Sequence, residues 1–297
     1  MSMQLPQFFT DNLQYQQDEV LQSFVDDLNK QFKHSIKSII FYGSCMRTHE
    51  YHDAMLDFYV IVDEYSNAYT NNWHRIANRL LPPNVFFIQT EINGKKYRAK
   101  YAVMTYSALL DGVSNAFHSY FWARFAQPIC YIYTCDDSTK QKIVDVQCNA
   151  AKSFYRALIA NFENMPTASD FWIEGLKLTY RAELRAETKT RAAHIYESDK
   201  DFYDKIFSIL ISQENNSNHA SSINLFKWKI RIFYGKVLSI LRLMKATTTF
   251  VGGVDYIAWK ITRHTGEEVV VSENMRRWPW LYCWPVIFKL LKQGKIR

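Results

Sequence analysis

The sequence predicts an α+β protein of two domains: a mixed sheet with helices over residues 1–143, then a mainly helical domain over residues 144–275. Before residue 144, five stretches rich in strand-forming residues alternate with helical or turn segments. After it, four long stretches carry helical periodicity and few turn residues. A third segment, residues 276–297, is basic and aromatic. At 297 residues the chain is long enough to bury a substantial core.

The first element is an amphipathic helix over residues 17–33, predicted from apolar side chains at helical spacing: Val20, Leu21, Phe24, Val25 and Leu28. Strands are expected at residues 36–41, 55–62, 85–92, 99–104 and 128–134. Helices are expected at residues 144–162, 171–197, 201–212 and 223–246. A polar run at residues 213–219 interrupts the helices and is expected to be a mobile loop, because its side chains bury too little apolar surface to order it.

The composition argues against several classes of protein. The net charge is +7, and the last 22 residues carry six of the basic side chains and no acid, so the remainder is near +1. This favours a local anionic partner, lipid or RNA, over a chain wrapped in nucleic acid. The five cysteines form no C-x-x-C pair, which indicates a reducing compartment without a disulfide framework or zinc site. The absence of an apolar stretch of about 18 residues predicts a soluble or peripheral protein.

A glycine-serine turn follows the strand at residues 36–41. Gly43 lets the backbone approach a ligand, and backbone amides and the Ser44 hydroxyl there can meet a triphosphate. An ordinary strand-to-helix turn would contain the same dipeptide. The next strand adds a second signal, because Asp57 lies between Leu56 and Phe58, where a carboxylate is costly unless it is paired or bound to metal.

A Gly-Ser turn with an acid on the adjoining strand resembles the nucleotidyltransferase superfamily, whose strand carboxylates hold Mg²⁺ on nucleotide phosphates. That pattern has a second acid two residues after Asp57, and here the position is Tyr59. Asp53 and Glu91 are the candidates for a second metal ligand, with solvated surface acids as the alternative interpretation. Asp63 is predicted to be a turn or capping residue, because six strand residues of roughly 3.3 Å each separate it from Asp57.

Further motifs occur in a fixed order along the chain: YGS at residues 42–44, AMLDFYVIVDE around Asp57, Trp73-His74 with Asn78, AKYAVM with Lys100 and Tyr101, FWARFAQP with Arg124 and Pro128, GLKLTYRAELR with Gly175, Leu176, Tyr180, Glu183 and Arg185, and the pair Lys260 and Gly266. This ordered set resembles the mitochondrial translocator assembly and maintenance family, as a bacterial-type member. The sequence departs from the family pattern at Cys45, Gln127, Ala182 and Glu183, and it lacks a Ser-Ser before Lys260.

The resemblance implies a nucleotidyltransferase-like fold and a CTP:phosphatidate cytidylyltransferase. Such an enzyme transfers CMP from CTP to phosphatidic acid and makes CDP-diacylglycerol and pyrophosphate for phospholipid synthesis, with Mg²⁺ as cofactor and without a nucleic-acid partner. The implied location is peripheral, on the cytoplasmic face of a bacterial inner membrane or the matrix side of the mitochondrial inner membrane. The implied catalytic residues are Asp57, as metal ligand, Ser44 and Lys100. The implied nucleotide or phosphate contacts are Gly43, Ser44, Lys100, Tyr101, Arg124, Arg185 and Lys260.

Two other functions remain open from the residues alone. One is a nucleotidyltransferase that acts on a soluble or protein acceptor, and the other is a non-catalytic membrane-binding module on a degenerate nucleotidyltransferase scaffold. The presence of a single strand carboxylate, Asp57, favours the non-catalytic module. Lys100 and Arg124 have apolar neighbours in the sequence. Each is expected to extend its charge into water, to pair with an acid of the protein, or to meet a triphosphate and a phosphate-bearing acceptor.

The terminal segment, residues 276–297, combines Trp278, Trp280 and Trp284 with its six cations. Indole rings beside cations favour a headgroup interface, so this segment is expected to dock on an anionic membrane. The alternative is a terminal helix packed on the protein core.

Overall fold

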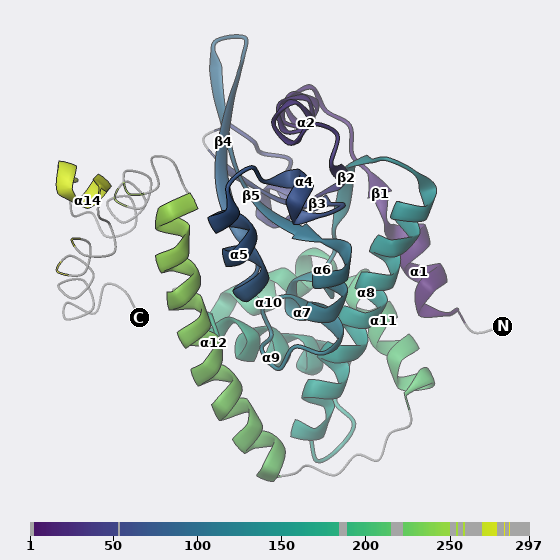
Figure 1. Cartoon of the computed structure of the whole chain (residues 1–297). Coiled ribbons are helices and arrows are strands. Elements are labelled where there is room, and N and C mark those ends of the chain that lie inside the picture. The colour runs from purple at the N-terminus through teal and green to yellow at the C-terminus, as the bar shows by residue number, and fades with distance from the viewer. Residues whose placement is uncertain are drawn as a thin grey trace.

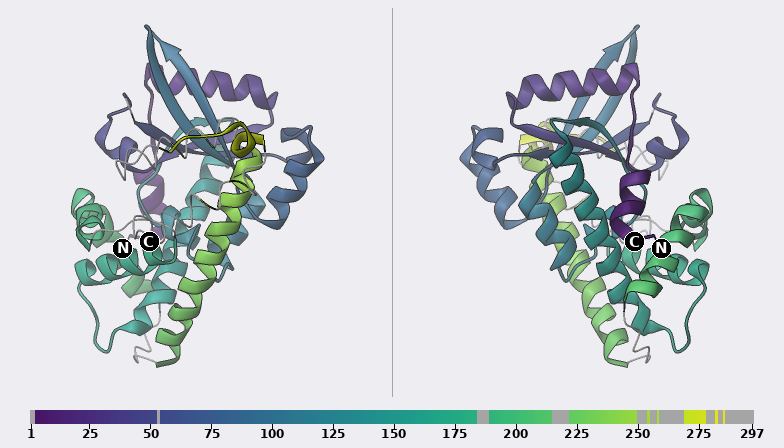
Figure 2. Two further views of the ribbon diagram at one scale, coloured as in Figure 1. Left: turned by 90° about the vertical axis from the view of Figure 1, so that its left-hand side faces the viewer. Right: turned by 90° about the vertical axis from the view of Figure 1, so that its right-hand side faces the viewer.

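The chain folds into a mixed six-stranded sheet with helices, followed by a helical region, as expected for the α+β class (Figure 1). The computed structural model describes residues 3–52, 54–183, 189–214, 222–249 and 269–277, together with residues 254, 258, 282 and 285. The two views in Figure 2 show the helical region beneath the sheet.

The sheet has the strand order β1-β6-β2-β3-β5-β4. Its strands are β1 (Gln14–Tyr15), β2 (Ile36–Tyr42), β3 (Met55–Val62), β4 (Asn84–Ile92), β5 (Lys95–Thr105) and β6 (Cys130–Thr134). The β3–β5 and β1–β6 pairs are parallel, and the β2–β3, β2–β6 and β4–β5 pairs are antiparallel. The five strands expected from the sequence are confirmed. Strand β1 was not expected, because two residues are too few to carry a periodic signal.

Within the residues described, seven helices precede the helical region: α1 (Leu5–Asn12), α2 (Glu19–Phe32), α3 (Ser44–Thr48), α4 (Tyr65–Ala68), α5 (Asn72–Leu80), α6 (Tyr106–Ser114) and α7 (Trp122–Phe125). Helix α2 confirms the predicted amphipathic helix. Its N-cap is Asp18, whose side chain accepts a hydrogen bond of 2.8 Å from the Val20 amide. Its C-cap is Lys33, in the left-handed region at φ 48°.

The helical region contains α8 (Asp137–Leu158), the 3₁₀ turn η1 (Ile159–Asn161), α9 (Ala168–Arg181), α10 (Lys189–Ser198), α11 (Lys200–Gln213), α12 (Ser222–Thr249) and α14 (Glu273–Arg277). The helix expected over residues 171–197 was wrong as one element, because α9 ends with Ala182 as its C-cap and α10 begins at Lys189. The residues after Arg181 have ordinary helix propensities, so periodicity gave no sign of a break. Most of the polar run at residues 213–219 lies outside the described residues.

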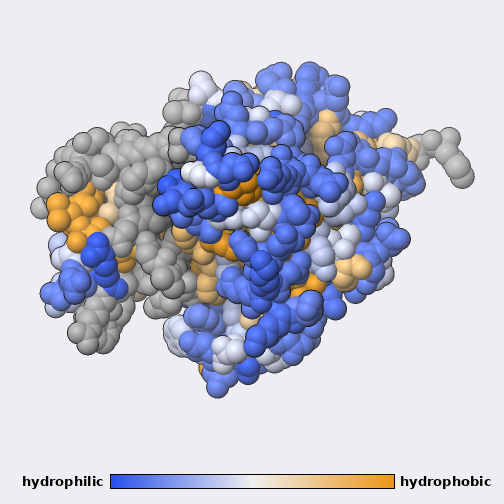
Figure 3. Space-filling model, turned by 90° about the horizontal axis from the view of Figure 1, so that it is seen from above, coloured by the Kyte–Doolittle hydropathy of each residue, from blue (hydrophilic) through white to orange (hydrophobic). Residues whose placement is uncertain are grey.

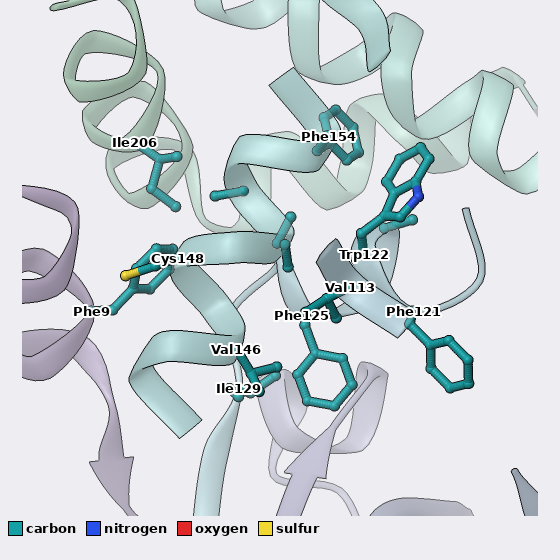
Figure 4. Close-up of a cluster of buried hydrophobic side chains, with 14 of the residues drawn as sticks. Phe9, Val113, Phe121, Trp122, Phe125, Ile129, Val146, Cys148, Phe154 and Ile206 are labelled. Atoms are coloured by element: carbon teal, nitrogen blue, oxygen red, sulfur yellow. The ribbon is translucent and has the colours of Figure 1, made fainter. Parts of the chain in front are cut away.

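Alternation along β3 separates two hydrophobic clusters on the two faces of the sheet. Leu56, Phe58 and Val60 pack on one face with helix α2. Tyr59 and Ile61 join the larger cluster on the other face, with α1, α6, α7 and α8. Figure 4 shows labelled members of that larger cluster: Phe9, Val113, Phe121, Trp122, Phe125, Ile129, Val146, Cys148, Phe154 and Ile206. The larger cluster therefore continues from the sheet into the helical region.

No helix within the described part of the chain is long and apolar enough to cross a bilayer.

Gly175 of α9 tests this packing. An added Cβ there would lie 2.5 Å from the Phe154 ring, so Gly175→Ala should overpack the core and lower the free energy of unfolding by about 1–3 kcal/mol, measured by urea denaturation. Lys177→Ala, on a half-exposed position of the same helix, is the control and should change stability by less than about 0.5 kcal/mol. Equal stability of the two variants would contradict the tight contact.

Candidate functional site

The turn after β2 requires glycine. Gly43 has φ 93° and ψ −165°, a backbone conformation that residues with a side chain rarely adopt. A Cβ at this position would also lie 3.2 Å from Oδ2 of Asp57. The missing side chain therefore leaves a small space directly beside the carboxylate, and the exposed Ser44 begins α3 on the next residue.

Asp57 faces Lys100 across two parallel strands. The register pairs Asp57 of β3 with Tyr42 of β2 on one side and with Lys100 of β5 on the other. The Lys100 ammonium nitrogen lies 3.0 Å from Oδ1 of Asp57, with the two side chains 36% and 22% exposed. The strand carboxylate is thus paired by a cation and still reached by solvent, and both charges stand at the end of the sheet where Gly43 turns.

The position two residues after Asp57 holds a core aromatic. Tyr59 is buried, with its ring centroid 5.1 Å from that of Tyr42 and 4.9 Å from that of Phe125. Burial raises the pKa of the Tyr59 hydroxyl, which stays protonated at neutral pH. No group of three or more His, Cys, Asp or Glu side chains placed to hold a metal occurs among the residues described.

The other acids considered from the sequence lie elsewhere. Glu91 pairs with Lys96 in the β4–β5 hairpin, four residues along β4 from Phe87, the partner of Lys100. That offset of about 13 Å along the strand separates Glu91 from Asp57 by more than one metal ion can bridge. Asp63 confirms its predicted turn role, because Oδ1 accepts from the Glu64 amide at 2.6 Å and Oδ2 from the Asn67 amide group at 3.0 Å. Asp53 lies outside the described residues.

A second ion pair is buried deeper. Nη2 of Arg124 in α7 donates to Oε2 of Glu183 at 2.9 Å, and both side chains are mostly buried. The Arg124 guanidinium also lies 4.0 Å from the centroid of the Tyr120 ring. Burial alone would lower the pKa of Arg124, but the Glu183 carboxylate and the nearby tyrosines hold it above its usual value. Of the alternatives that the sequence left open for Arg124, the structure shows the pairing with an acid.

Two tyrosines in ring contact, Tyr42 and Tyr59, lie near both ion pairs. Burial raises the pKa of the Tyr42 hydroxyl, Asp57 raises it further, and Arg124 lowers it. Tyr42 thus lies within the field of both pairs, while Tyr59 packs against it. The arrangement forms one continuous polar strip, from the partly exposed Asp57–Lys100 pair to the buried Arg124.

Several residues implied by the resemblance do not join this strip. Tyr101 follows Lys100 but points to the opposite face of the sheet, where it is buried and its hydroxyl accepts from Nε2 of Gln31 at 2.7 Å. Asn78 is buried and structural, because its side chain donates to the Val103 carbonyl at 2.9 Å. Arg185 and Lys260 lie outside the described residues.

No sequence pattern indicated a role for Arg242. This residue of α12 places its guanidinium 4.0 Å from the centroid of the Tyr120 ring, the ring that Arg124 also contacts, and its Nε donates to the Pro82 carbonyl at 2.9 Å. A basic residue on a helix is usually solvated, so only the fold reveals that this one lies near the strip.

Comparisons with known proteins give a distant structural similarity. No family model and no curated protein matches the chain. Among solved structures, the chain is similar to a nucleotidyltransferase-like protein from Exiguobacterium sibiricum 255-15, with 9% sequence identity over 93% of this chain and 92% of that chain and a TM-score of 0.27. The assignment of a reaction therefore depends on the residues of the site itself.

Gly43→Ala should disturb the site, because it combines an unfavourable φ with a contact of 3.2 Å to Asp57. We expect a loss of about 1–3 kcal/mol in the free energy of unfolding, measured by urea denaturation. Gly94→Ala is the control, since Gly94 also has positive φ, 73°, but no atom within 4 Å of an added Cβ. An equal loss in both variants would show that the approach to Asp57 has no energetic effect.

Glu183→Gln should leave the Arg124 guanidinium buried without a counter-charge and lower the free energy of unfolding by about 3 kcal/mol. The double variant Arg124→Leu/Glu183→Leu should recover part of this loss, because no buried charge is left uncompensated. Glu214→Gln removes the partner of the largely exposed Arg156 and should cost less than about 1 kcal/mol. If Glu183→Gln is no more destabilising than Glu214→Gln, the buried pair is not required for stability.

Proposed function

We propose that the chain is a nucleotidyltransferase that binds the phosphates of a nucleoside triphosphate at the end of β2. The observation that carries this proposal is the meeting of the Gly43 backbone, the Asp57 carboxylate and the Lys100 ammonium at one point on one face of the sheet. A turn without a side chain admits a phosphate, and a partly exposed lysine supplies a positive charge for it.

Asp57 is the residue that would hold Mg²⁺. Its Oδ2 borders the space left by the missing side chain of Gly43, and a single carboxylate suits an ion whose other ligands are water and substrate phosphate oxygens. Bound there, the ion would neutralise charge on the nucleotide phosphates. Lys100 would then turn from Asp57 toward the same phosphates, which its partial exposure permits.

The finer proposal is a CTP:phosphatidate cytidylyltransferase at a membrane surface, on the cytoplasmic or matrix side. It is supported by the sequence resemblance and by the fact that Arg124 and Glu183, from two separate segments of that resemblance, form one ion pair. A phosphate oxygen of phosphatidic acid would attack the α-phosphorus of CTP. The bond from that phosphorus to the β-phosphate would break and release pyrophosphate. Since the acceptor is already anionic, positioning and charge neutralisation suffice without a general base.

A non-catalytic scaffold is the second candidate, and one observation favours it. The position of the second superfamily acid is filled by Tyr59, a buried core residue, so Asp57 is the one strand carboxylate at this point of the described sheet. A scaffold of this kind would bind CTP with Mg²⁺ weakly or not at all, which calorimetry measures directly.

Asp57→Asn should abolish turnover and leave the fold intact, because it keeps the side-chain shape and removes the charge that binds metal. The assay incubates purified protein with labelled CTP, Mg²⁺ and phosphatidate vesicles and measures labelled CDP-diacylglycerol. Circular dichroism and the unfolding midpoint check the fold of the variant.

Asp63→Asn is the matched control, because Asp63 lies just beyond the same strand and its side chain accepts hydrogen bonds from Glu64 and Asn67 of its own turn. It should keep full turnover. No CDP-diacylglycerol from folded wild-type protein would contradict the lipid acceptor. A turnover rate of CTP or ATP that does not depend on added vesicles would indicate a soluble or protein acceptor. Equal turnover in wild type and Asp57→Asn would show that Asp57 has no role in the mechanism.

A further inference from the structure

Helix α12 carries an apolar stripe on its solvent-facing side. Six side chains recur at spacings of four and three residues, with exposed fractions from 36% to 71%: Phe226, Ile230, Phe233, Val237, Ile240 and Met244. This spacing returns to the same side of the helix at every step, so the stripe is continuous over about 27 Å. Figures 1 and 2 show α12 along the outer side of the molecule.

The opposite side of α12 is already docked on the protein. The Trp228 indole nitrogen donates to the Ala157 carbonyl at 2.9 Å, and Nε of Arg231 donates to the Phe117 carbonyl at 2.7 Å. A Cβ at Gly235 would lie 2.6 Å from the Ala182 carbonyl oxygen, so the helix approaches its neighbour closely there. These contacts fix the rotation of α12 about its axis, and the stripe is held facing outward.

A stripe of this size is unusual on a protein surface that faces only water. The described surface seen from above in Figure 3 is mostly hydrophilic, with apolar residues in separate patches. The exposed fractions of Phe226 and Phe233, 62% and 71%, are high for aromatic side chains. Exposure of two aromatic and four aliphatic side chains in one line indicates a binding surface.

The charges on α12 identify the kind of partner. The helix contains six basic residues and no acid: Lys227, Lys229, Arg231, Lys236, Arg242 and Lys245. Lys227, Lys229 and Lys236 are exposed. At 3.6 residues per turn, Lys229 and Lys236 fall on one side of the stripe and Lys227 on the other. A second copy of this helix would bring lysines together without acids, and residues 276–297, basic and free of acid, would meet the same repulsion.

We propose that the stripe of α12 lies on an anionic lipid surface, with its apolar side chains in the headgroup region and its lysines reaching the lipid phosphates. An amphipathic helix with cations on the flanks of its apolar face has the chemistry that such an interface binds. This proposal deepens the proposed function, because a phosphatidate acceptor stays in the bilayer. Only the biological purpose of membrane docking rests on the proposed function; the docking itself does not. Docking and nucleotidyl transfer are measured separately.

The test is sedimentation of the full-length protein with vesicles. Wild type should pellet with vesicles of equal parts phosphatidylcholine and phosphatidylglycerol, less with phosphatidylcholine alone, and less as salt screens the lysines. Phe226→Ser/Phe233→Ser should weaken partitioning at least about tenfold, since two aromatic rings no longer leave water. Tyr15→Ser, at a half-exposed aromatic on β1, is the control and should bind as wild type. Calorimetry with CTP and Mg²⁺ should be unchanged in every variant.

Other outcomes would overturn the proposal. Equal partitioning of Phe226→Ser/Phe233→Ser and wild type would remove the stripe from lipid binding. A wild-type dimer in light scattering that this variant converts to monomer would make a second copy the occupant. Loss of partitioning in full-length Lys289→Glu/Lys292→Glu, with the α12 variant unaffected, would assign docking to residues 276–297. Vesicle binding without nucleotide turnover would support the α12 surface and contradict the proposed enzyme.

Discussion

The registers of β2, β3 and β5 determine the site. The β2–β3 ladder sets Asp57 opposite Tyr42, one residue before the Gly43 turn, and the β3–β5 ladder sets it opposite Lys100. A slip of one residue would turn Asp57 to the other face of the sheet, into the cluster of Phe24 and Phe58, where its charge would be buried among aromatic rings. The apolar alternation that builds the two clusters therefore also fixes where the carboxylate appears.

The two ion pairs of the polar strip suit different tasks because water reaches them differently. Asp57 and Lys100 are partly exposed to water, so their ion pair can separate at small cost in free energy. Asp57 can then bind an incoming cation, and Lys100 an incoming anion. Arg124 and Glu183 are mostly shielded from water, so separating them would strand a charge. The first pair is therefore suited to binding, and the second to holding the strip in place.

Much of the fold was predictable, because the spacing of apolar side chains along the sequence indicates which side of an element is buried. The strands around Asp57 and the helix α2 were predicted in this way. Asp57 itself stood out, since a carboxylate in a strand needs a partner. The identity of that partner depends on β-sheet register, which the sequence pattern does not contain. Tyr101 was wrongly grouped with Lys100 as a phosphate contact. Consecutive residues of a strand point to opposite faces of the sheet, so Tyr101 does not share the site of Lys100. Arg242 was missed because its neighbours come from distant segments.

The shared core has a consequence for how such a chain can change over evolutionary time. Tyr59 of the sheet and Phe154 of the helical region belong to one cluster, and Arg124 of α7 is paired with Glu183, which follows α9. Recombination that exchanged either part with a homologous chain would break both the packing and the charge balance at once. The two parts therefore depend on each other for packing and for charge balance, and exchange of one part alone should destabilise the fold.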